Sequence, residues 1–442
     1  MKIRENVAIV GAGLAGSEVA WQLAERGHAV RLFEMRPKCM TPAHKTGECA
    51  ELVCSNSFKS LSKENAHGLL KSEMSILKSM ILETGKKFSV PAGQALAVDR
   101  KLFAEGVSER LKKHPLISFC KKEINCIEDL INSYSYVVIA TGPLTSDALS
   151  SSLQKILGEK YLSFYDAISP VVTEESINMK KAFRGSRYGR GNGDYINCPM
   201  NSKQYEKFID GVKKSEKAQL HNFEEIRPFE GCLPIETMIE RGPDTLRFGP
   251  MKPVGLAHPK TGERFHAVVQ LRQENVIGSL YNLVGFQTKM TWAAQKKIFK
   301  MIPGLENADF VRLGSIHRNT FLNSPVLLNS QLSLKSNPKL FFAGQITGVE
   351  GYMESTAMGI LVARQISAIL ENRKPSTPSP ETMIGALLKY ITESDPNNFQ
   401  PMNANFGLLV SPQKKMNKSD RRTWYSQRAL KKTAEYLNDL KI

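Results

Sequence analysis

The sequence predicts an α/β fold in which a smaller α+β domain is inserted into a Rossmann-like domain of the kind that binds dinucleotides. Two glycine-rich strand–turn–helix patterns indicate the Rossmann-like domain, one at residues 7–26 and one at residues 339–370. Between them, glycine-rich and charged stretches alternate with short β-rich runs. We therefore expect residues 1–160 and 311–442 to form the first domain and residues 161–310 to form the inserted one.

The first pattern opens with Val7–Val10, an apolar and β-branched run that favours a buried parallel strand. Three glycines then supply a tight turn, a close approach of the backbone to a pyrophosphate, and a tight contact between helix and strand. A helix is expected over Ser17–Arg26, with the positive end of its dipole toward the phosphates. The residues that we expect to bind the cofactor here are Gly11, Ala12, Gly13, Leu14, Ala15 and Gly16.

A second strand, Ala29–Phe33, is predicted to end at Glu34. A carboxylate at this place in a βαβ unit can accept hydrogen bonds from the hydroxyl groups of a ribose. Glycine patterns alone often occur by chance, whereas strand, turn, helix, strand and acid in this order rarely do. The N-terminal unit therefore predicts a bound adenine dinucleotide.

Two later elements narrow the dinucleotide to FAD. The apolar strand Tyr136–Ala140 is followed by Thr-Gly, an ending that is typical of flavoproteins with two dinucleotide-binding elements. The strand Lys339–Ala343, the glycine-rich turn 344–351 and a helix over Ser355–Leu370 resemble the second flavin-contacting element of FAD enzymes. A helix N-terminus at this place stabilises the reduced, anionic flavin ring.

This second element is expected to bind FAD through Gly344, Gln345 and Gly348. FAD enzymes commonly carry aspartate after the glycine of this strand, so Gln345 has to make a neutral hydrogen bond instead. An ordinary βα unit is the alternative interpretation. With the flavin, the first domain is a Rossmann-like FAD-binding domain.

The charge of the chain indicates which kind of partner it binds. The net charge of +17, from 60 Lys and Arg against 43 Asp and Glu, favours a polyanionic partner such as nucleic acid, with solubility alone as the alternative. The basic segment 414–432, with Trp424 and Tyr425, suits either a phosphate backbone with an unstacked base or a solvated helix.

The seven cysteines include no CxxC pair, so no metal is expected. No leader and no apolar run of roughly 20 residues is found, so we expect a cytoplasmic protein with no membrane partner.

Cys54 and Cys232 lie in settings that differ from those of the other cysteines. Cys54 is followed by Ser-Asn-Ser, residues that are common in loops. Cys232 stands between Gly231 and Pro234, which favour a tight exposed turn. Each is either an accessible, reactive thiol or a structural cysteine, and these settings alone leave both interpretations open.

Eight segments carry a resemblance to one family. They are Gly11–Glu18, Phe33–Pro37, Glu51–Ser57, Phe229–Glu236, Phe248–Leu256, Leu280–Thr288, His317–Phe321 and Ala343–Tyr352. Together they resemble the folate- and FAD-dependent tRNA (uracil-5-)-methyltransferases, the TrmFO family. The resemblance runs from the first strand to about residue 410, and the lysine-rich C-terminal region is the main departure.

The resemblance implies a transfer of one carbon from 5,10-methylenetetrahydrofolate, the co-substrate, to C5 of a uridine in the T-loop of tRNA. Reduced FAD then makes the carbon a methyl group, which gives 5-methyluridine, and NADH or NADPH reduces the flavin again. Uracil C5 is a poor nucleophile until a group adds to C6, and a thiolate suits that addition best. The resemblance implies that both cysteines are catalytic, with Cys232 attacking C6 and Cys54 handling a proton or lying near the flavin.

Three other functions are alternatives to this one. The same chemistry on a uridine of 23S ribosomal RNA is not excluded by the motifs. A flavoprotein that builds carboxymethylaminomethyl groups on wobble uridine shares the fold, but its chain is typically much longer. In a non-catalytic, FAD-stabilised RNA-binding protein, both thiols would be dispensable.

Overall fold

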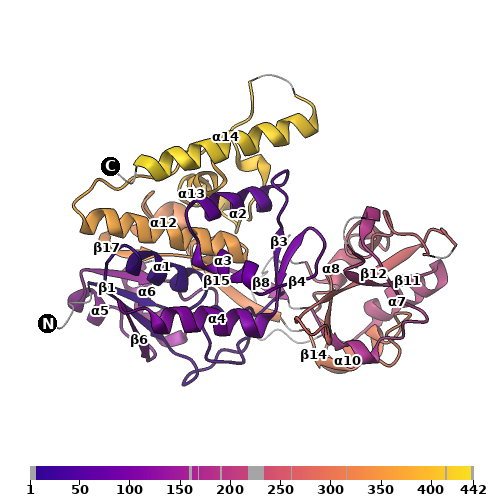
Figure 1. Ribbon diagram of the computed structural model, residues 1–442. Coiled ribbons are helices and arrows are strands. Elements are labelled where there is room, and N and C mark those ends of the chain that lie inside the picture. Colours follow the sequence, from indigo (N-terminus) through magenta and orange to yellow (C-terminus); the bar gives the residue numbers. More distant parts are fainter. Residues whose placement is uncertain are drawn as a thin grey trace.

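A six-stranded sheet forms the centre of the larger part of the molecule (Figure 1). The strands from β17 to β6 run parallel, and the edge strand β16 is antiparallel to β17. In spatial order the strands are β16 (Ser333–Leu334), β17 (Asn337–Phe342), β7 (Tyr136–Ile139), β1 (Val7–Val10), β2 (Val30–Glu34) and β6 (Ile117–Lys121). The apolar, β-branched sequence of β1 accords with its place here, because β1 is a central strand and is buried over its whole length.

The computed structural model describes residues 6–158, 162–167, 169–189, 192–217, 233–259, 261–314, 316–413 and 416–439. Within these ranges no helix is long and apolar enough to cross a membrane.

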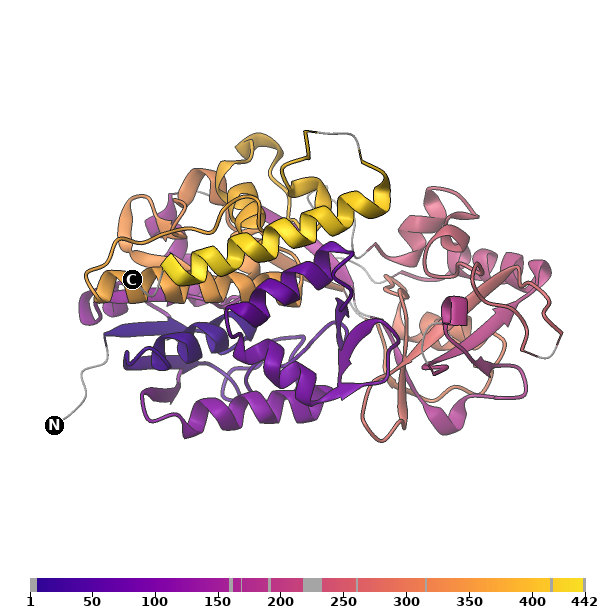
Figure 2. The same cartoon turned by 45° about the horizontal axis from the view of Figure 1, so that its top comes forward.

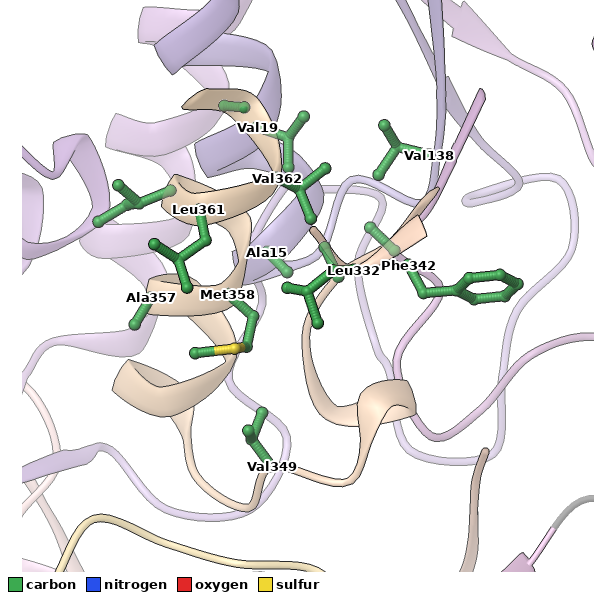
Figure 3. Packing of buried hydrophobic residues seen from close by; sticks show 14 of the residues in the cluster. Ala15, Val19, Val138, Leu332, Phe342, Val349, Ala357, Met358, Leu361 and Val362 are labelled. Carbon is green, nitrogen blue, oxygen red and sulfur yellow. The ribbon is translucent and has the colours of Figure 1, made fainter. Parts of the chain in front are cut away.

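Helices α1 and α12 pack against each other beside the sheet, and α2, α13 and α14 form a layer beyond them (Figures 1 and 2). The helices of this part are α1 (Leu14–Ala24), α2 (Ala66–Ile76), α3 (Met80–Lys87), α4 (Arg100–Lys113), α5 (Glu128–Ser133), α6 (Asp147–Leu157), α11 (Ser324–Leu327), α12 (Tyr352–Leu370), α13 (Met383–Glu393) and α14 (Lys418–Asp439). Apolar side chains of α1 and α12, among them Val19 and Leu361, interdigitate in the core between the helices and the sheet (Figure 3).

Two helices begin earlier than the sequence predicts. Helix α1 starts at Leu14, not at Ser17, and α12 starts at Tyr352, not at Ser355. In both cases a glycine directly before the helix serves as the N-cap, Gly13 with extended backbone angles and Gly351 with φ of +118°, so the glycine-rich turn is shorter than expected. The amide groups of each first turn consequently lie immediately beside the glycine turn.

A second body contains an antiparallel sheet with a core of its own (Figure 1). Its strands, in spatial order, are β10 (Phe183–Arg184), β11 (Tyr195–Met200), β12 (Ala267–Gln273), β13 (Leu280–Leu283), β9 (Val171–Thr173) and β14 (Phe310–Arg312). The helices that accompany this sheet are α7 (Ser202–Lys214), α8 (Ile235–Glu240), α9 (Thr245–Phe248) and α10 (Trp292–Phe299). Phe208, Phe286 and Phe299 are fully buried there.

The chain passes between the two bodies through a pair of antiparallel strands. Strand β8 (Leu162–Ala167) leaves the first body after α6, and β15 (Ile316–Phe321) returns to it (Figure 1). A small sheet of β3 (Ser57–Ser60), β5 (Ala95–Val98) and β4 (Ser89–Val90) lies on the side of the first body that faces the second. The loop that carries Cys54 runs directly into β3 and therefore lies at this junction.

Candidate active site

The first glycine turn leaves open space in front of α1. Gly13 is the N-cap of α1 and makes no side-chain capping bond, and a Cβ added to it would meet no atom within 4 Å. Gly11 has φ of +100°, and a Cβ on Gly16 would collide with the carbonyl oxygen of Gly11. The turn therefore requires glycine at 11 and 16 for the fold, whereas at 13 it leaves room where a phosphate group fits against the helix N-terminus.

Glu34 lies at the end of β2, as predicted, but its carboxylate is already engaged. Oε2 accepts from the Ala12 amide at 2.9 Å and from Nη2 of Arg36 at 3.2 Å, while Oε1 accepts from N and Nε of Arg36 at 3.0 Å each. Burial alone raises the pKa of Glu34, but the bonds and charge of Arg36 outweigh burial and hold it below its usual value. Because a carboxylate has about four acceptor positions, a ribose hydroxyl has to displace one of these donors.

The second glycine turn meets the first one in space. Gly344 has φ of +87°, and a Cβ on it would come within 2.7 Å of the Cβ of Ala15. Gly348 is also left-handed, with φ of +89°. The side-chain amide nitrogen of Gln345 donates to Oε2 of Glu350 at 2.6 Å. Both residues belong to the second glycine turn, so this side chain bonds within the turn.

Cys54 lies beside the first turn of α12. Its backbone amide donates to the hydroxyl of Tyr352, the first residue of that helix, at 2.9 Å. Its carbonyl accepts from Nη2 of Arg100 at 2.9 Å and from Nη2 of Arg312 at 3.3 Å. The backbone of Cys54 is thus bonded to the side chain of the residue that begins α12, the helix of the second glycine-rich element.

Cys232 lies outside the described residues, so its distance from Cys54 is not given by the structure. The residues that follow it are held firmly: the amide of Ile235 donates to the carbonyl of Gln287 at 2.8 Å. Glu236 is buried, and its Oε1 accepts from the amide of Lys289 at 3.0 Å and from the hydroxyl of Thr288.

A cavity of about 660 Å³ opens next to the Cys54 loop, between the two bodies. Trp292 of α10 lies at its wall with two thirds of its surface exposed. Burial and the neighbouring charge of Arg100 lower the pKa of Arg312 to about 10, and the buried Nε of Arg312 has no hydrogen-bond partner. The cavity is lined by Pro42, Ala43, Lys45, Thr46, Glu48, Glu51, Leu52, Val53, Arg100, Lys101, Ala104, Glu105, Trp292, Lys296, Phe310, Val311, Arg312 and Leu313.

The first turn of α12 also carries a buried carboxylate. Although burial alone raises the pKa of Glu354, the charge of Lys59 and the hydrogen bond from His67 lower it to about 2. Nδ1 of His67 lies 3.2 Å from Oε1 of Glu354, which also accepts from the amide of Ala404 at 3.0 Å. In the part of the chain that the structure describes, no group of three or more His, Cys, Asp or Glu side chains is placed to hold a metal ion.

Three residues that contact Cys54 were not predicted from the sequence. Tyr352, Arg100 and Arg312 each bond to the backbone of Cys54 across 46 or more residues of sequence. Tyr352 carried a partial signal, because it directly follows the glycine-rich turn. Arg100 and Arg312 stand in ordinary helix and strand sequence, and nothing local distinguishes them from other arginines.

Comparisons with known proteins identify the relatives of this chain. A family model described as "Glucose inhibited division protein A" matches residues 6–374. The chain is 52% identical over 436 residues to "Methylenetetrahydrofolate--tRNA-(uracil-5-)-methyltransferase TrmFO" of Desulforudis audaxviator, covering 98% of both chains. It is 51% identical over 429 residues to the protein of the same name from Bacillus licheniformis, covering 97% of this chain and 98% of that one.

A solved structure shows the same fold at low identity. The GidA protein of Aquifex aeolicus superimposes with a TM-score of 0.70 at 16% identity, covering 98% of this chain and 73% of that one. The predicted α/β, Rossmann-like fold is thereby confirmed. The chain belongs to the glucose inhibited division protein A family and, at the identities found, to its TrmFO group of methylenetetrahydrofolate–tRNA-(uracil-5-)-methyltransferases.

Proposed function

We propose that this chain methylates C5 of a uridine in the T-loop of tRNA, with 5,10-methylenetetrahydrofolate as the carbon donor and reduced FAD as the reductant. The identity of 52% along 98% of the chain to a protein named for this reaction supports the activity. The observation on the site that carries the proposal is the bond from the Cys54 amide to Tyr352, at 2.9 Å. It holds the backbone of Cys54 against the side chain of the first residue of α12, the helix whose N-terminus is expected to face a flavin ring.

The residues around both glycine turns fit FAD. The uncapped N-terminus of α1 and the space in front of Gly13 suit the pyrophosphate. The uncapped N-terminus of α12, after Gly351, suits the electron-rich edge of the flavin ring. When bound, FAD supplies the electrons that reduce the transferred carbon to a methyl group, and NADH or NADPH supplies them in turn. The proposed contacts are Gly11, Ala12, Gly13, Leu14, Ala15, Gly16, Glu34, Gly344, Gln345 and Gly348.

Two thiols divide the work on the uracil ring in this proposal. Cys232 adds to C6, which makes C5 nucleophilic, and it leaves again after the C5 proton has been removed. Cys54 handles that proton or acts beside the flavin. The guanidinium groups of Arg100 and Arg312, both on the carbonyl of Cys54, supply positive charge where an anionic sulfur would need it.

The cavity beside Cys54 is the place that we propose for the folate. Its volume of about 660 Å³ lies within the usual range of small-molecule sites, roughly 300–1,000 Å³. The exposed ring of Trp292 offers a stacking surface, and Lys45, Lys101 and Lys296 offer positive charge for carboxylates. We also propose that the two cores correspond to an FAD-binding domain of residues 1–160 and 311–442 and an inserted domain of residues 161–310, with strand β14 extending the second sheet to Arg312.

Methyl transfer from labelled 5,10-methylenetetrahydrofolate to in vitro transcripts tests this function. We expect label at the T-loop uridine of tRNA and none on fragments of 23S ribosomal RNA. The opposite pattern would replace tRNA by ribosomal RNA as the substrate, and no label on either RNA from a yellow, flavin-loaded protein would reject the activity.

Cysteine variants test the two thiols. Cys54→Ala and Cys232→Ala should each lose turnover while the flavin stays bound, by a factor on the order of 100 or more. Cys198→Ala is the matched control, because Cys198 is fully buried in the second core and burial raises its pKa to about 12, so that it stays a neutral thiol. Full turnover in either variant would remove that cysteine from the mechanism.

A further inference from the structure

Arg100 attaches the loop that carries Cys54 to the second body. Its Nη1 donates to the carbonyl of Leu52 at 2.6 Å, and its Nη2 donates to the carbonyl of Cys54 at 2.9 Å. Nε and Nη2 also donate to the two carboxylate oxygens of Glu274, at 2.7 and 3.2 Å. Glu274 begins the turn between β12 and β13, so one side chain joins the loop of one body to the hairpin of the other.

The neighbouring contacts join the same two segments. Asn56, fully buried, donates to the carbonyl of Gln273 at 2.9 Å and accepts from Nε of Arg272 at 3.0 Å. Asp99 caps α4 with one carboxylate oxygen, and the other accepts from the amide of Val276 at 3.0 Å. The hairpin is therefore fixed on both sides of Glu274, and Arg100 is the member of this set that reaches the carbonyl of Cys54.

The ion pair is desolvated but remains charged. Burial opposes the charge on both partners, yet their mutual attraction holds the pKa of Glu274 below its usual value and that of Arg100 above its own. The side chain of Glu274 is only 4% exposed. Removal of the carboxylate of Glu274 takes from the buried Arg100 the main negative charge that compensates it.

The same hairpin also leads toward the motif of the second cysteine. The chain after β13 runs into residues 287–289, whose backbone bonds to Ile235 and Glu236, the last two residues of that motif. The loop of Cys54 and the segment after Cys232 are thus both bonded to one stretch of chain. A rigid bridge of this kind can set how the two segments lie relative to each other.

We propose that Arg100 is a positioning residue for Cys54, and that its ion pair with Glu274 fixes the Cys54 loop relative to the inserted domain. The proposal rests on the proposed function, in which both thiols act on one uridine. Reacting groups displaced by about 1 Å can lose on the order of 100-fold in rate, so a firmly held loop matters for turnover.

Glu274→Gln tests the ion pair in the full-length, flavin-loaded protein. We expect kcat for tRNA methylation to fall about ten-fold and the KM for tRNA to stay within about two-fold, because alignment and not binding is lost. Alkylation of Cys54 by iodoacetamide, without tRNA or folate and followed by peptide mass spectrometry, should become about three-fold faster as the loop loosens. Glu83→Gln, on α3, is the matched control, because it removes the carboxylate of an exposed ion pair with Arg110, which lies on the same helix α4 as Arg100.

Glu274→Gln would overturn the proposal if its kcat or its alkylation rate equalled that of Glu83→Gln. Should Glu274→Gln fail to retain flavin, Glu274→Asp keeps the charge with a shorter reach, and intermediate values of both quantities are expected there, whereas wild-type values would overturn the proposal. The two proposals fail separately. A wild-type protein without methyl transfer rejects the function, while the alkylation rates still decide whether the ion pair fixes the Cys54 loop.

Discussion

Lys71 carries a buried amine next to β3, the strand that follows Cys54. Its side chain is 2% exposed, and its Nζ donates to the carbonyls of Phe58 at 2.7 Å and His67 at 2.8 Å. Burial lowers the pKa of Lys71 to about 7. The amine therefore titrates near physiological pH, with two carbonyl groups accepting its hydrogens.

This burial predicts how stability depends on pH. In the unfolded chain Lys71 keeps its proton up to its ordinary pKa of 10.5, whereas the native state releases it near 7. Between these values the unfolded state binds more protons, so the contribution of Lys71 to the free energy of unfolding rises with pH, by a few kcal/mol at about 1.4 kcal/mol for each pKa unit. Lys71→Met should remove this rise, as measured by thermal unfolding at pH 7 and pH 9.5.

The exposed Lys101 provides the comparison, since its side chain is 83% exposed. Lys101→Met should leave the difference in Tm between the two pH values as it is in the wild type. A Lys71→Met protein with the wild-type difference would show that this amine stays protonated in the folded protein.

Single site residues can be predicted from the sequence where the residues that form the site are close together in the chain. Glu34 and the glycines stand in a pattern that a dinucleotide site requires, and the structure places them around one turn. Arg36 was not predicted to bond Glu34, although the two are only two residues apart, because a side chain's partner depends on its rotamer. Arg100 and Tyr352 were missed because their contacts with Cys54 arise only when distant segments meet.

Helices α1 and α12 approach so closely that two glycines take opposite roles. A Cβ on Gly359 of α12 would lie 2.6 Å from the carbonyl oxygen of Ala15 in α1, and that backbone cannot move aside easily. A Cβ on Gly13 would meet nothing within 4 Å. One glycine therefore serves the packing of the helices, and the other leaves the space in front of the α1 N-terminus open.

Alanine at these two positions separates packing from cofactor binding. Gly359→Ala should lower the free energy of unfolding by about 1–3 kcal/mol, because overpacking forces backbone shifts. Gly13→Ala should leave stability nearly unchanged without cofactor but weaken FAD binding, because its methyl group fills the space proposed for the pyrophosphate. Denaturant unfolding of the apoprotein and flavin titration measure the two effects. A Gly13→Ala protein with wild-type FAD affinity would contradict the proposed pyrophosphate position.

At the scale of elements, the sequence located strands better than helix starts. The predicted runs at Val7–Val10 and Tyr136–Ala140 agree with β1 and β7 to within one residue. The predicted starts of α1 and α12 are three residues too late. They were predicted from the spacing of apolar residues, whereas each helix begins directly after a glycine N-cap. From Lys418 onward the basic tail segment forms helix α14, and whether it contacts phosphates stays a prediction.

In the whole molecule, part of the excess positive charge lies on the exposed side of helix α14. Helix α14 lies along the outside of the first body, packed against α2 (Figure 2). Lys418 and Arg421 are exposed near its start, whereas Arg428 is held by Glu381 and lies over Trp424. The exposed cations are available to phosphates, and Arg428 instead ties the helix to the body.

A double variant, Lys418→Gln with Arg421→Gln, tests whether this end of α14 contacts RNA. We expect weaker tRNA binding at low salt and a salt dependence of log Kd that is shallower by about one unit for each lost phosphate contact. Filter binding or fluorescence anisotropy across salt concentrations measures both. Lys213→Gln with Lys214→Gln, on α7, removes the same charge from an exposed helix end of the second body. Equal effects of the two pairs would mean that only the net charge matters.

The sequence by itself determined the α/β class, the two glycine turns and the family, because these depend on residues that are close together in the chain. Only the tertiary structure decided what holds Cys54, since Tyr352, Arg100 and Arg312 reach it from elements that are far apart in sequence. The ion pair between Arg100 and Glu274 spans 174 residues and both bodies. No local pattern encodes such a contact, because the free energy that favours it appears only after burial has brought the two charges together.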